Sequence, residues 1–204
     1  MALANYSDLK AKIASNMDRS DLTSDIPDFI ALAEADINVA LNVFGMESRA
    51  YATMTAGSDY LTLPSDHRST RRLQIVSGGI DYMLEQVDPS YIAGKDDGGT
   101  GMPKVYSILA DQIQFWPTPD SDYRVEQTYE QSLPALSDSN TTNWLLTDYP
   151  NIYLYGSLYH ACVFIFDDKR AGQFAALFTT LLEQLESRDR DKKYGGHPLR
   201  TRAV

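Results

Sequence analysis

The sequence predicts an α+β fold, mainly an α-helical bundle with a β-rich insertion between the second helix and the C-terminal helices. Apolar residues recur at helical spacing within residues 1–52 and 143–194. Between these parts, residues 53–135 contain runs that alternate or carry β-forming residues, as half-buried strands do. We therefore expect a helical bundle made of 1–52 and 143–194, a β-rich insertion at 53–135 and a flexible C-terminal tail at 195–204.

Two amphipathic helices are expected to open the chain. The first follows Ser7, a suitable N-cap, and the DRSD stretch at 18–21 ends it. The second has Asp25 at its start and Gly45 at its end. The apolar stripe of the first consists of Leu9, Ile13 and Met17. The stripe of the second consists of Ile26, Phe29, Ile30, Ala33, Ile37, Ala40, Leu41 and Phe44. Both stripes are suited to core packing.

The insertion is expected to hold short strands joined by tight turns. Gly78-Gly79 and Ala110-Asp111 each separate two runs of β-forming residues, as hairpin turns do. The expected strands are YLTLP (60–64), RRLQIV (71–76), IDYMLEQV (80–87), VYSIL (105–109), QIQFWP (112–117) and YRVEQTYE (123–130). A polar linker at 134–143 then returns the chain to helix.

The segment from Asn143 to Phe166 is almost entirely apolar or aromatic. Polar and small residues interrupt it too often for a transmembrane helix, which needs about 20 mostly apolar residues. Its tyrosine hydroxyls also need hydrogen-bond partners, which protein supplies and lipid does not. Because a helix that is apolar on all sides is a central helix, we expect no membrane contact, Pro150 in the first helical turn, and Tyr155 and Phe166 buried.

A last amphipathic helix precedes the tail. Its apolar stripe consists of Phe174, Leu177, Phe178, Leu181, Leu182 and Leu185. Its polar extension contains Glu186 and Arg190, which are four residues apart and can pair on a solvated helix. Gly195-Gly196 and Pro198 then stop the helix. The remaining residues hold too little apolar surface for a core of their own, so we expect them to be mobile.

Charge is unevenly distributed along the chain. The net charge is −10, which opposes tight nonspecific binding to DNA. Residues 183–204 nevertheless carry a net charge of +2, whereas residues 1–182 carry −12. An acidic body with a basic end is typical of a protein with an interaction tail. The single cysteine, Cys162, excludes an intramolecular disulfide and a multi-cysteine zinc site, and suits a reducing cytoplasm.

The loop GKDDGGTG (94–101) is the one stretch that suggests phosphate or metal binding. A phosphate-binding loop needs its lysine after the glycines and a helix behind it, but Lys95 precedes most of the glycines and a strand follows. Asp96 and Asp97 also lack the alternating spacing of calcium ligands. A loop between strands is the favoured interpretation, and no metal or cofactor is expected.

No residue is assigned a catalytic role. His160 and Cys162 suggest a nucleophile pair, but residues two apart on a helix do not face each other. A buried thiol and a hydrogen-bonded histidine are the favoured interpretation. A pair of carboxylates for glycoside cleavage stays open, because their separation in space cannot be read from sequence.

HRSTRR (67–72) concentrates Arg68, Arg71 and Arg72 beside His67. A solvated strand edge with charged residues that prevent aggregation is the favoured interpretation. Contact with nucleic acid or with an acidic neighbouring subunit is the alternative.

Three segments follow one another in an order that is informative. The first is YSDLKAKIASNMDRSDL followed by IPDFIALAEADINVAL, a helix, an arginine-aspartate break and a helix with an AEADIN core. The second is MPKVYSILADQIQFWPTPDSDYRVEQTYEQSLPAL, a hairpin and the strand before the linker. The third is NWLLTDYPNIYLYGSLYHACVFIFDD. In this order the three segments, which cover residues 5 to 190 approximately, resemble the head-to-tail adaptor (connector, or tail tubular protein A-like) family of short-tailed bacteriophages.

The resemblance implies a structural virion protein that forms a ring, generally of twelve copies, between the portal protein and the tail nozzle. Such a ring extends the channel through which genomic DNA passes without specific binding. The protein would be made in the host cytoplasm and would act in the virion, without catalysis or cofactor. Family members dock on the portal through their C-terminal segments. The matching residues here are Arg188, Arg190, Lys192, Lys193, Tyr194, His197, Leu199, Arg200 and Arg202.

Two alternatives belong to other functional classes. Some relatives are linked to peptidoglycan cleavage, so a virion-associated hydrolase is the first alternative, although no residue here carries that activity over. A DNA-binding regulator is the second, and the net charge of −10 disfavours it.

Overall fold

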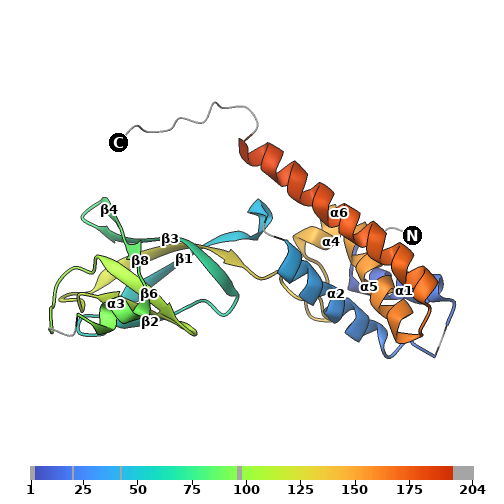
Figure 1. Cartoon of the computed structure of the whole chain (residues 1–204), viewed down its shortest axis with the longest axis horizontal. Helices are drawn as coiled ribbons and strands as arrows, with labels where there is room; N and C mark the ends of the chain where they lie inside the picture. Colours follow the sequence, from blue (N-terminus) through green and yellow to red (C-terminus); the bar gives the residue numbers. More distant parts are fainter. Residues whose placement is uncertain (1–2, 20, 42, 96–97, 195–204) are drawn as a thin grey trace. The chain divides into compact units, whose positions relative to one another are not determined.

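The computed structural model of the chain describes residues 3–19, 21–41, 43–95 and 98–194. The chain forms two compact units, shown in Figure 1. The helical unit contains Met1–Gly45 and Leu133–Val204, and the β unit contains Met46–Ser132. N-terminal helices, central β-sheets and long C-terminal helices confirm the α+β class.

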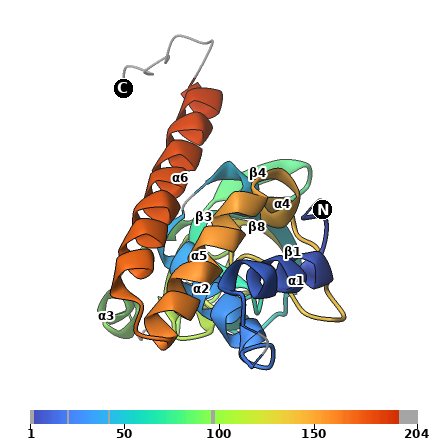
Figure 2. The same ribbon diagram turned by 90° about the vertical axis from the view of Figure 1, so that its right-hand side faces the viewer.

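The helical unit is built around helix α5. Its helices are α1 (Tyr6–Met17), α2 (Ile26–Ala40), α4 (Trp144–Asp148), α5 (Pro150–Phe164) and α6 (Asp168–Tyr194). Helix α5 packs against the other four, and Figure 2 shows it between α1 and α6. Buried residues come from most of its circumference, which confirms the expected central helix. They are Ile152, Tyr153, Leu154, Gly156, Ser157, Leu158, Ala161 and Cys162.

Gly156 lets α5 approach two neighbours at once. A Cβ atom at this position would lie 2.9 Å from Cε2 of Phe178 on α6 and 3.1 Å from Cβ of Ala33 on α2. Contacts this short are repulsive for carbon atoms. The missing side chain therefore sets how closely α2, α5 and α6 pack.

The apolar segment from Asn143 to Phe166 differs from the expected single helix. The backbone of Tyr149 (φ −136°, ψ 56°) separates α4 from α5, and Pro150 is the first residue of α5, as predicted. Helix α5 ends at Phe164, and Phe166 has a φ of 59° and is 89% exposed. The prediction that Phe166 is buried was wrong. Tyr155 is half-buried and stacks on Phe174, with ring centroids 6.1 Å apart.

Hydrogen bonds explain the position of Phe166. The N–H of Phe166 donates to Val163 O (3.1 Å), and the N–H of Asp167 donates to Cys162 O (2.9 Å). This pattern, with one left-handed residue, is the Schellman motif that ends many helices. Glycine usually occupies the left-handed position, and here a phenylalanine does.

The first two helices agree with the sequence except at their ends. Asn5, not Ser7, caps α1, because its side chain accepts a hydrogen bond from Asp8 N (2.9 Å). Helix α2 ends at Ala40, before the expected Gly45, because Leu41 is extended. A short 3₁₀ helix, η1 (Phe44–Met46), follows.

The β unit consists of two four-stranded sheets, ordered β1-β8-β3-β4 and β2-β7-β6-β5. All strand pairs are antiparallel except β5 with β6. The strands are β1 (Glu47–Met54), β2 (Tyr60–Thr62), β3 (His67–Ser77), β4 (Ile80–Met83), β5 (Glu85–Gln86), β6 (Val105–Leu109), β7 (Gln112–Trp116) and β8 (Tyr123–Gln131), with helix α3 (Pro89–Ala93) after β5. Side chains from both sheets form one core, including Leu73, Ile75, Tyr106, Phe115 and Val125.

Both expected hairpin turns are present. Gly78 and Gly79 have positive φ angles (58° and 79°) between β3 and β4, and Ala110 (54°) lies between β6 and β7. Strand β1 was not expected, because residues 47–52 were assigned to the helical bundle. Glu47 pairs with Glu130 and Met54 with Tyr123, so β1 pairs with every residue of β8 except Gln131.

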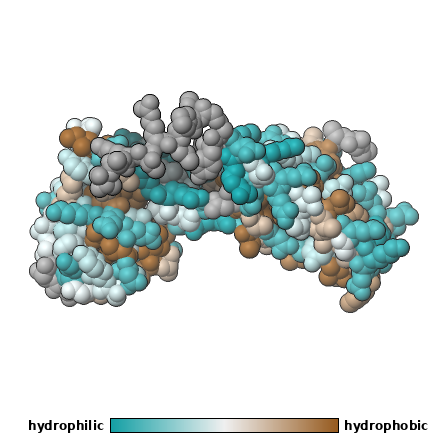
Figure 3. All heavy atoms as spheres, turned by 45° about the horizontal axis from the view of Figure 1, so that its top comes forward, coloured by the Kyte–Doolittle hydropathy of each residue, from teal (hydrophilic) through white to brown (hydrophobic). Residues whose placement is uncertain are grey.

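Large apolar side chains are exposed on both units. Figure 3 shows apolar patches set among hydrophilic residues. In the helical unit they include Val39, which is 85% exposed. Within the described residues, no helix combines the length and apolar character needed to cross a membrane.

Candidate functional site

The residues predicted to bind a portal lie at the C-terminal end of the chain. Arg188, Arg190, Lys192, Lys193 and Tyr194 belong to the last turns of α6. His197, Leu199, Arg200 and Arg202 lie outside the described residues. The structure therefore places five of the nine on one helix end.

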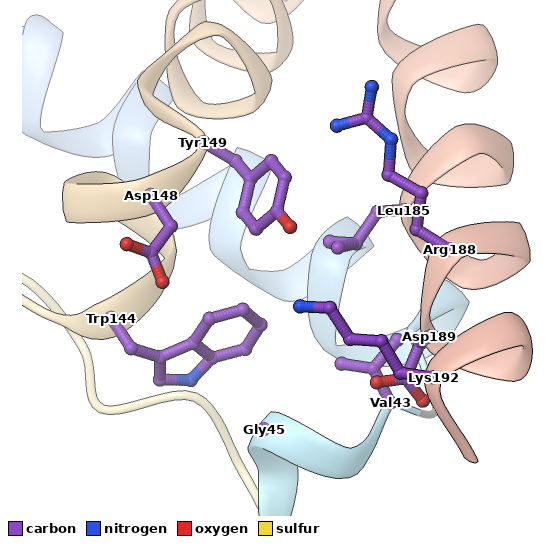
Figure 4. A pocket seen from close by; sticks show the side chains of 9 residues that line it. All are labelled: Val43, Gly45, Trp144, Asp148, Tyr149, Leu185, Arg188, Asp189 and Lys192. Atoms are coloured by element: carbon purple, nitrogen blue, oxygen red, sulfur yellow. The ribbon is translucent and has the colours of Figure 1, made fainter. Parts of the chain in front are cut away.

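Beside these turns lies a pocket of about 580 Å³, shown in Figure 4. One wall is the face of α6 that carries Arg188 and Lys192. The opposite wall comes from α4 and the start of α5, and Val43 and Gly45 close one end (Figure 4). The lining residues are Val43, Gly45, Trp144, Asp148, Tyr149, Leu185, Arg188, Asp189 and Lys192.

The wall opposite α6 is held by local hydrogen bonds. The side chain of Asn143 accepts a hydrogen bond from Leu146 N (2.9 Å) and so caps α4. This cap begins the helix directly at Trp144. The N–H of Tyr149 donates to Leu145 O (2.8 Å), after which Pro150 starts α5. The helix break therefore presents two aromatic side chains, of Trp144 and Tyr149, to the pocket.

Gly45 and Leu185 also line the pocket, beside Trp144 and on α6 respectively. A Cβ atom at Gly45 would lie 3.4 Å from three atoms of the Trp144 indole ring, an ordinary van der Waals distance, so the ring packs directly beside the backbone of Gly45. Leu185 is only 5% exposed and anchors α6 beside it. The aromatic floor of the pocket is thus preformed.

The pocket combines aromatic surface with charges of both signs. Arg188 and Lys192 are four residues apart and share one face of α6. Figure 4 shows the Lys192 side chain extending toward Trp144 and Tyr149. The indole N–H of Trp144 is buried and has no hydrogen-bond partner within the described part of the chain. Asp148 and Asp189 also line the pocket, so it can hold a partner side chain by apolar contact with the aromatic rings and by ion pairs at its rim.

Two cations of this pocket, Arg188 and Lys192, were singled out from the sequence, but its aromatic residues, Trp144 and Tyr149, were not. Trp144 and Tyr149 belong to the apolar segment that was assigned entirely to the core. Nothing in their spacing distinguishes a pocket wall from a core contact. The signal available was the Tyr149-Pro150 step, because a residue before proline is disfavoured in a helix.

His160 and Cys162, the other residues considered for chemistry, make contacts inside the helical unit. Nε2 of His160 lies 2.9 Å from Oδ2 of Asp36 on α2, so this histidine is hydrogen-bonded as expected. Cys162 is fully buried, and burial raises the pKa of its thiol. A raised pKa disfavours the thiolate and therefore a nucleophilic role.

The arginines of HRSTRR pair with carboxylates of the same unit. Arg71 donates to Glu130, and Arg72 lies 3.8 Å from Glu126. Glu126 and Glu130 are nearly buried on the central strand β8. Among the described strands, β4 pairs only with Gln74–Ser77 of β3, so the first half of β3 has an open edge, in agreement with the favoured interpretation.

The described part of the glycine-rich loop packs beside aromatic side chains. Asp96 and Asp97 lie outside the described residues. The ammonium group of Lys95 lies over the rings of Tyr91 and Trp116, 5.2 and 5.1 Å from their centroids. His, Cys, Asp and Glu side chains form no cluster of three or more suited to a metal ion among the residues that the structure describes.

Comparison with known proteins identifies the family. The family model described as SU10 adaptor protein matches residues 4–202, nearly the whole chain. A comparison with curated proteins finds none that matches. The expected resemblance to a phage adaptor family is thus confirmed, and the chain belongs to the SU10 adaptor protein family.

Proposed function

We propose that the chain is a structural component of the virion that joins the portal protein to the tail nozzle. The observation that carries this proposal is the match to a phage adaptor family over residues 4–202. An adaptor acts by binding other virion components, so its function lies in surfaces and requires no catalytic residue. The end of α6 is the surface that we assign to the portal.

Charge supports this assignment. Residues 183–204 carry +2 in a chain whose net charge is −10. In this proposal portal carboxylates pair with the basic residues at this end of the chain, which are Arg188, Arg190, Lys192, Lys193, Arg200 and Arg202. Further apolar and polar contacts come from Tyr194, His197 and Leu199. Arg188 and Lys192 also border the aromatic pocket, where an apolar portal side chain can be held between Trp144 and Tyr149. Charge-assisted hydrogen bonds are the stronger class and favour such pairing.

We further propose that adaptor copies form a ring, of twelve subunits, that extends the channel for genomic DNA. A ring needs two different complementary surfaces on each copy. The acidic composition suits a channel wall that repels phosphates and lets DNA slide. Because a net charge of −10 also opposes self-association, the isolated chain is expected to be mainly monomeric and to close into a ring on the portal.

The test is binding to the purified portal ring. The variant Arg188→Ser/Lys192→Ser removes two cations from the pocket rim, and we expect about tenfold weaker binding, since each pair lost is a charge-assisted hydrogen bond. The control Lys12→Ser/Lys169→Ser removes two exposed cations elsewhere in the helical unit and makes the same change in net charge. Parental affinity in the first variant would move the portal contact away from α6.

A further inference from the structure

The sheet β1-β8-β3-β4 has an open edge at each end. Among the strands that the structure describes, β1 pairs only with β8, and β4 pairs only with β3. Proteins usually protect open edges with bulges, charges or proline, because an open edge can pair with another chain. The open half of β3 is protected by two register shifts and three arginines. Strand β1 instead pairs over eight residues without a register shift and contains no proline or lysine.

The pairing shows which face each edge residue occupies. Tyr82 on β4 is opposite the core residue Ile75, and Ala52 on β1 is opposite the core residue Val125. Directly paired residues share a face, so Tyr82 and Ala52 lie on the core side of the sheet. Successive strand residues alternate between faces. The residues on the outer face are therefore Asp81 and Met83 of β4 and Arg49, Tyr51 and Thr53 of β1.

On β4 the outer-face residues direct their backbone groups to the open edge. The N–H of Leu84 donates to Leu73 O (3.0 Å), and hydrogen-bonded pairs recur at every second residue of an antiparallel ladder. Tyr82, two residues before Leu84, therefore also bonds to β3. The N–H and C=O groups of Asp81 and Met83 consequently point away from β3 and are available to a further strand.

The same alternation applies to β1. On β3 the core-side residues bond to β4, so outer-face residues such as Gln74 bond to β8. Gln74 is opposite Glu126, and the two residues of β8 that flank Glu126 therefore bond to β1. These flanking residues are opposite Ala50 and Ala52. The N–H and C=O groups of the outer-face residues of β1, such as Tyr51 between the two alanines, thus point to the open edge.

On the outer face, the side chains at the two edges have opposite charge. The side chain of Arg49 is 57% exposed, and the guanidinium group of Arg124 lies 4.5 Å from the ring centroid of Tyr51. Two cations therefore flank Tyr51 at the β1 edge. The β4 edge presents the exposed carboxylate of Asp81. A carboxylate placed opposite Tyr51 can accept charge-assisted hydrogen bonds from these arginines.

On the core side, the two edges differ in the size of their side chains. Strand β1 has only Ala50 and Ala52 there, beside an apolar hollow of about 190 Å³ that Leu61 also lines. Strand β4 has Ile80 and Tyr82, which are 57% and 40% exposed. Large exposed apolar side chains on one edge thus match a hollow beside small ones on the other edge. Pairing the two edges would remove this apolar surface from water.

The strand directions also allow the two edges to pair. Neighbouring strands of this sheet are antiparallel, so β1 and β3 run one way and β8 and β4 run the other way. A second copy placed beside the first in the same orientation brings its β1 next to β4 in an antiparallel arrangement. Such a contact joins two different surfaces and can be repeated from copy to copy, as a closed ring requires.

We propose that β4 of one copy pairs with β1 of the next, so that one sheet continues between copies. Asp81 lies opposite Tyr51, and this register places Ile80 opposite Ala52 and Tyr82 opposite Ala50. The inference rests on the proposed function in that copies assemble side by side, and it identifies the contact between them. Because β4 has only four residues, the contact is weak between free chains in dilute solution and is strengthened when copies gather on the portal.

Disulfide trapping between two variants of the full-length chain tests the contact. Tyr51→Cys and Asp81→Cys are mixed, with a tag on one variant so that a mixed dimer is recognised by its mass. The native Cys162 is fully buried and does not compete. Hydrogen-bonded partners have Cα atoms about 5.5 Å apart, a distance that a disulfide can bridge. We expect mixed dimers to form about tenfold faster than from Tyr51→Cys with Leu109→Cys, in which the second cysteine is exposed on the other sheet.

Trapping is measured both on the portal ring and with the concentrated free chain. The second condition makes the result independent of portal binding. Melting curves under reducing conditions verify that each variant is folded. Met83→Cys mixed with Tyr51→Cys reports the neighbouring register, two residues away, and should crosslink more slowly than Asp81→Cys.

A proline substitution tests the backbone pairing separately. Proline lacks the N–H group but is tolerated on edge strands. Tyr51→Pro removes an N–H that points to the open edge and leaves the bonds to β8 in place, whereas Tyr51→Ala removes the same ring and keeps the N–H. We expect Tyr51→Pro to weaken self-association of the concentrated chain about tenfold relative to Tyr51→Ala, as measured by sedimentation equilibrium. The trapping experiment remains decisive if Tyr51→Pro does not fold.

The outcomes separate this inference from the proposed function. Trapping no faster with Asp81→Cys than with Leu109→Cys, both on the portal and in the concentrated free chain, would overturn the edge pairing. Copies that still sediment with the portal in that case would leave the proposed function intact. Fast trapping in the free chain without any binding to the portal would support the edge pairing and contradict the proposed function.

Discussion

The hydroxyl of Tyr153 donates a hydrogen bond to the carboxylate of Glu34, 3.0 Å away. Both side chains are buried, on α5 and α2. The amide of Asn143 donates to the same hydroxyl (2.6 Å), and Leu136 N donates to the same carboxylate oxygen (2.8 Å). This network fastens the returning linker, residues 133–143, to the helix pair at the centre of the helical unit.

Replacing Tyr153 by phenylalanine should destabilise the protein by about 1–3 kcal/mol, because the Glu34 carboxylate and the Asn143 amide each lose a buried partner. Urea unfolding followed by circular dichroism measures the change. Tyr82→Phe, on a side chain that is 40% exposed, is the matched control and should have little effect. Equal unfolding midpoints for the two variants would contradict a structural role for the network.

Glu34 should make stability depend on pH. Burial raises the pKa of its carboxyl group above the usual 4.5, although hydrogen bonds from Leu136 and Tyr153 oppose the shift. A raised pKa means that the folded state binds the proton more tightly than the unfolded state. Its stabilising contribution is therefore full below the unfolded pKa and is lost as pH rises through the folded pKa.

Comparison with Glu34→Gln isolates this effect. The free energy of unfolding of the parent, relative to the variant, should fall as pH rises from about 4 to 7. Urea titrations at several pH values measure this difference, and Glu183→Gln supplies the corresponding data for an exposed glutamate. A difference that rises with pH would show that the hydrogen bonds outweigh burial.

Alanine substitutions at two glycines are expected to change stability in opposite directions. Gly156→Ala should destabilise by about 1–3 kcal/mol, because its Cβ would overlap Phe178 and Ala33. Gly172→Ala on α6 should stabilise by about 0.5–1 kcal/mol, since its Cβ meets no atom within 4 Å and alanine favours helix. Thermal melts measure both variants. A melting temperature for Gly156→Ala equal to or above that of the parent would mean that α5 does not pack as described, and a lower one for Gly172→Ala would contradict the open space at that position.

Phe166 should tolerate truncation. Phe166→Ala removes an exposed side chain and is expected to change stability little. Phe166→Gly should be more stable than Phe166→Ala by about 1 kcal/mol, because a left-handed backbone costs non-glycine residues about that amount. Chemical denaturation of the two variants measures the difference. A large loss in Phe166→Ala would mean that the side chain is buried after all.

Much of the fold could be predicted because its signals are local. The stripes of α1 and α6, the proline that starts α5 and the glycine pair before β4 each act within a few residues. The central position of α5 could also be predicted from the sequence, since a helix that is apolar on all sides must be covered on all sides.

The errors arose where distant contacts decide the structure. Strand β1 carries the small residues Ser48, Ala50 and Ala52, which give little β signal, and its pairing with β8 fixes it. Phe166 follows an apolar run and looks like core, but the Schellman motif turns it outward. Likewise, the pocket beside Arg188 is lined by Gly45, Trp144 and Leu185, which are far apart in the sequence.

The pairing of Glu47 with Glu130 has an evolutionary consequence. The chain leaves the helical unit at the start of β1 and returns to it at the end of β8, and these two strands are neighbours in one sheet. In the connectivity of the helical unit, the whole β unit therefore takes the place of a single loop between α2 and α4. The entropy of closing a loop grows only slowly with its length. Insertions of very different size or shape can therefore be exchanged at this junction while the helical scaffold is retained, and the two units are free to diversify at different rates.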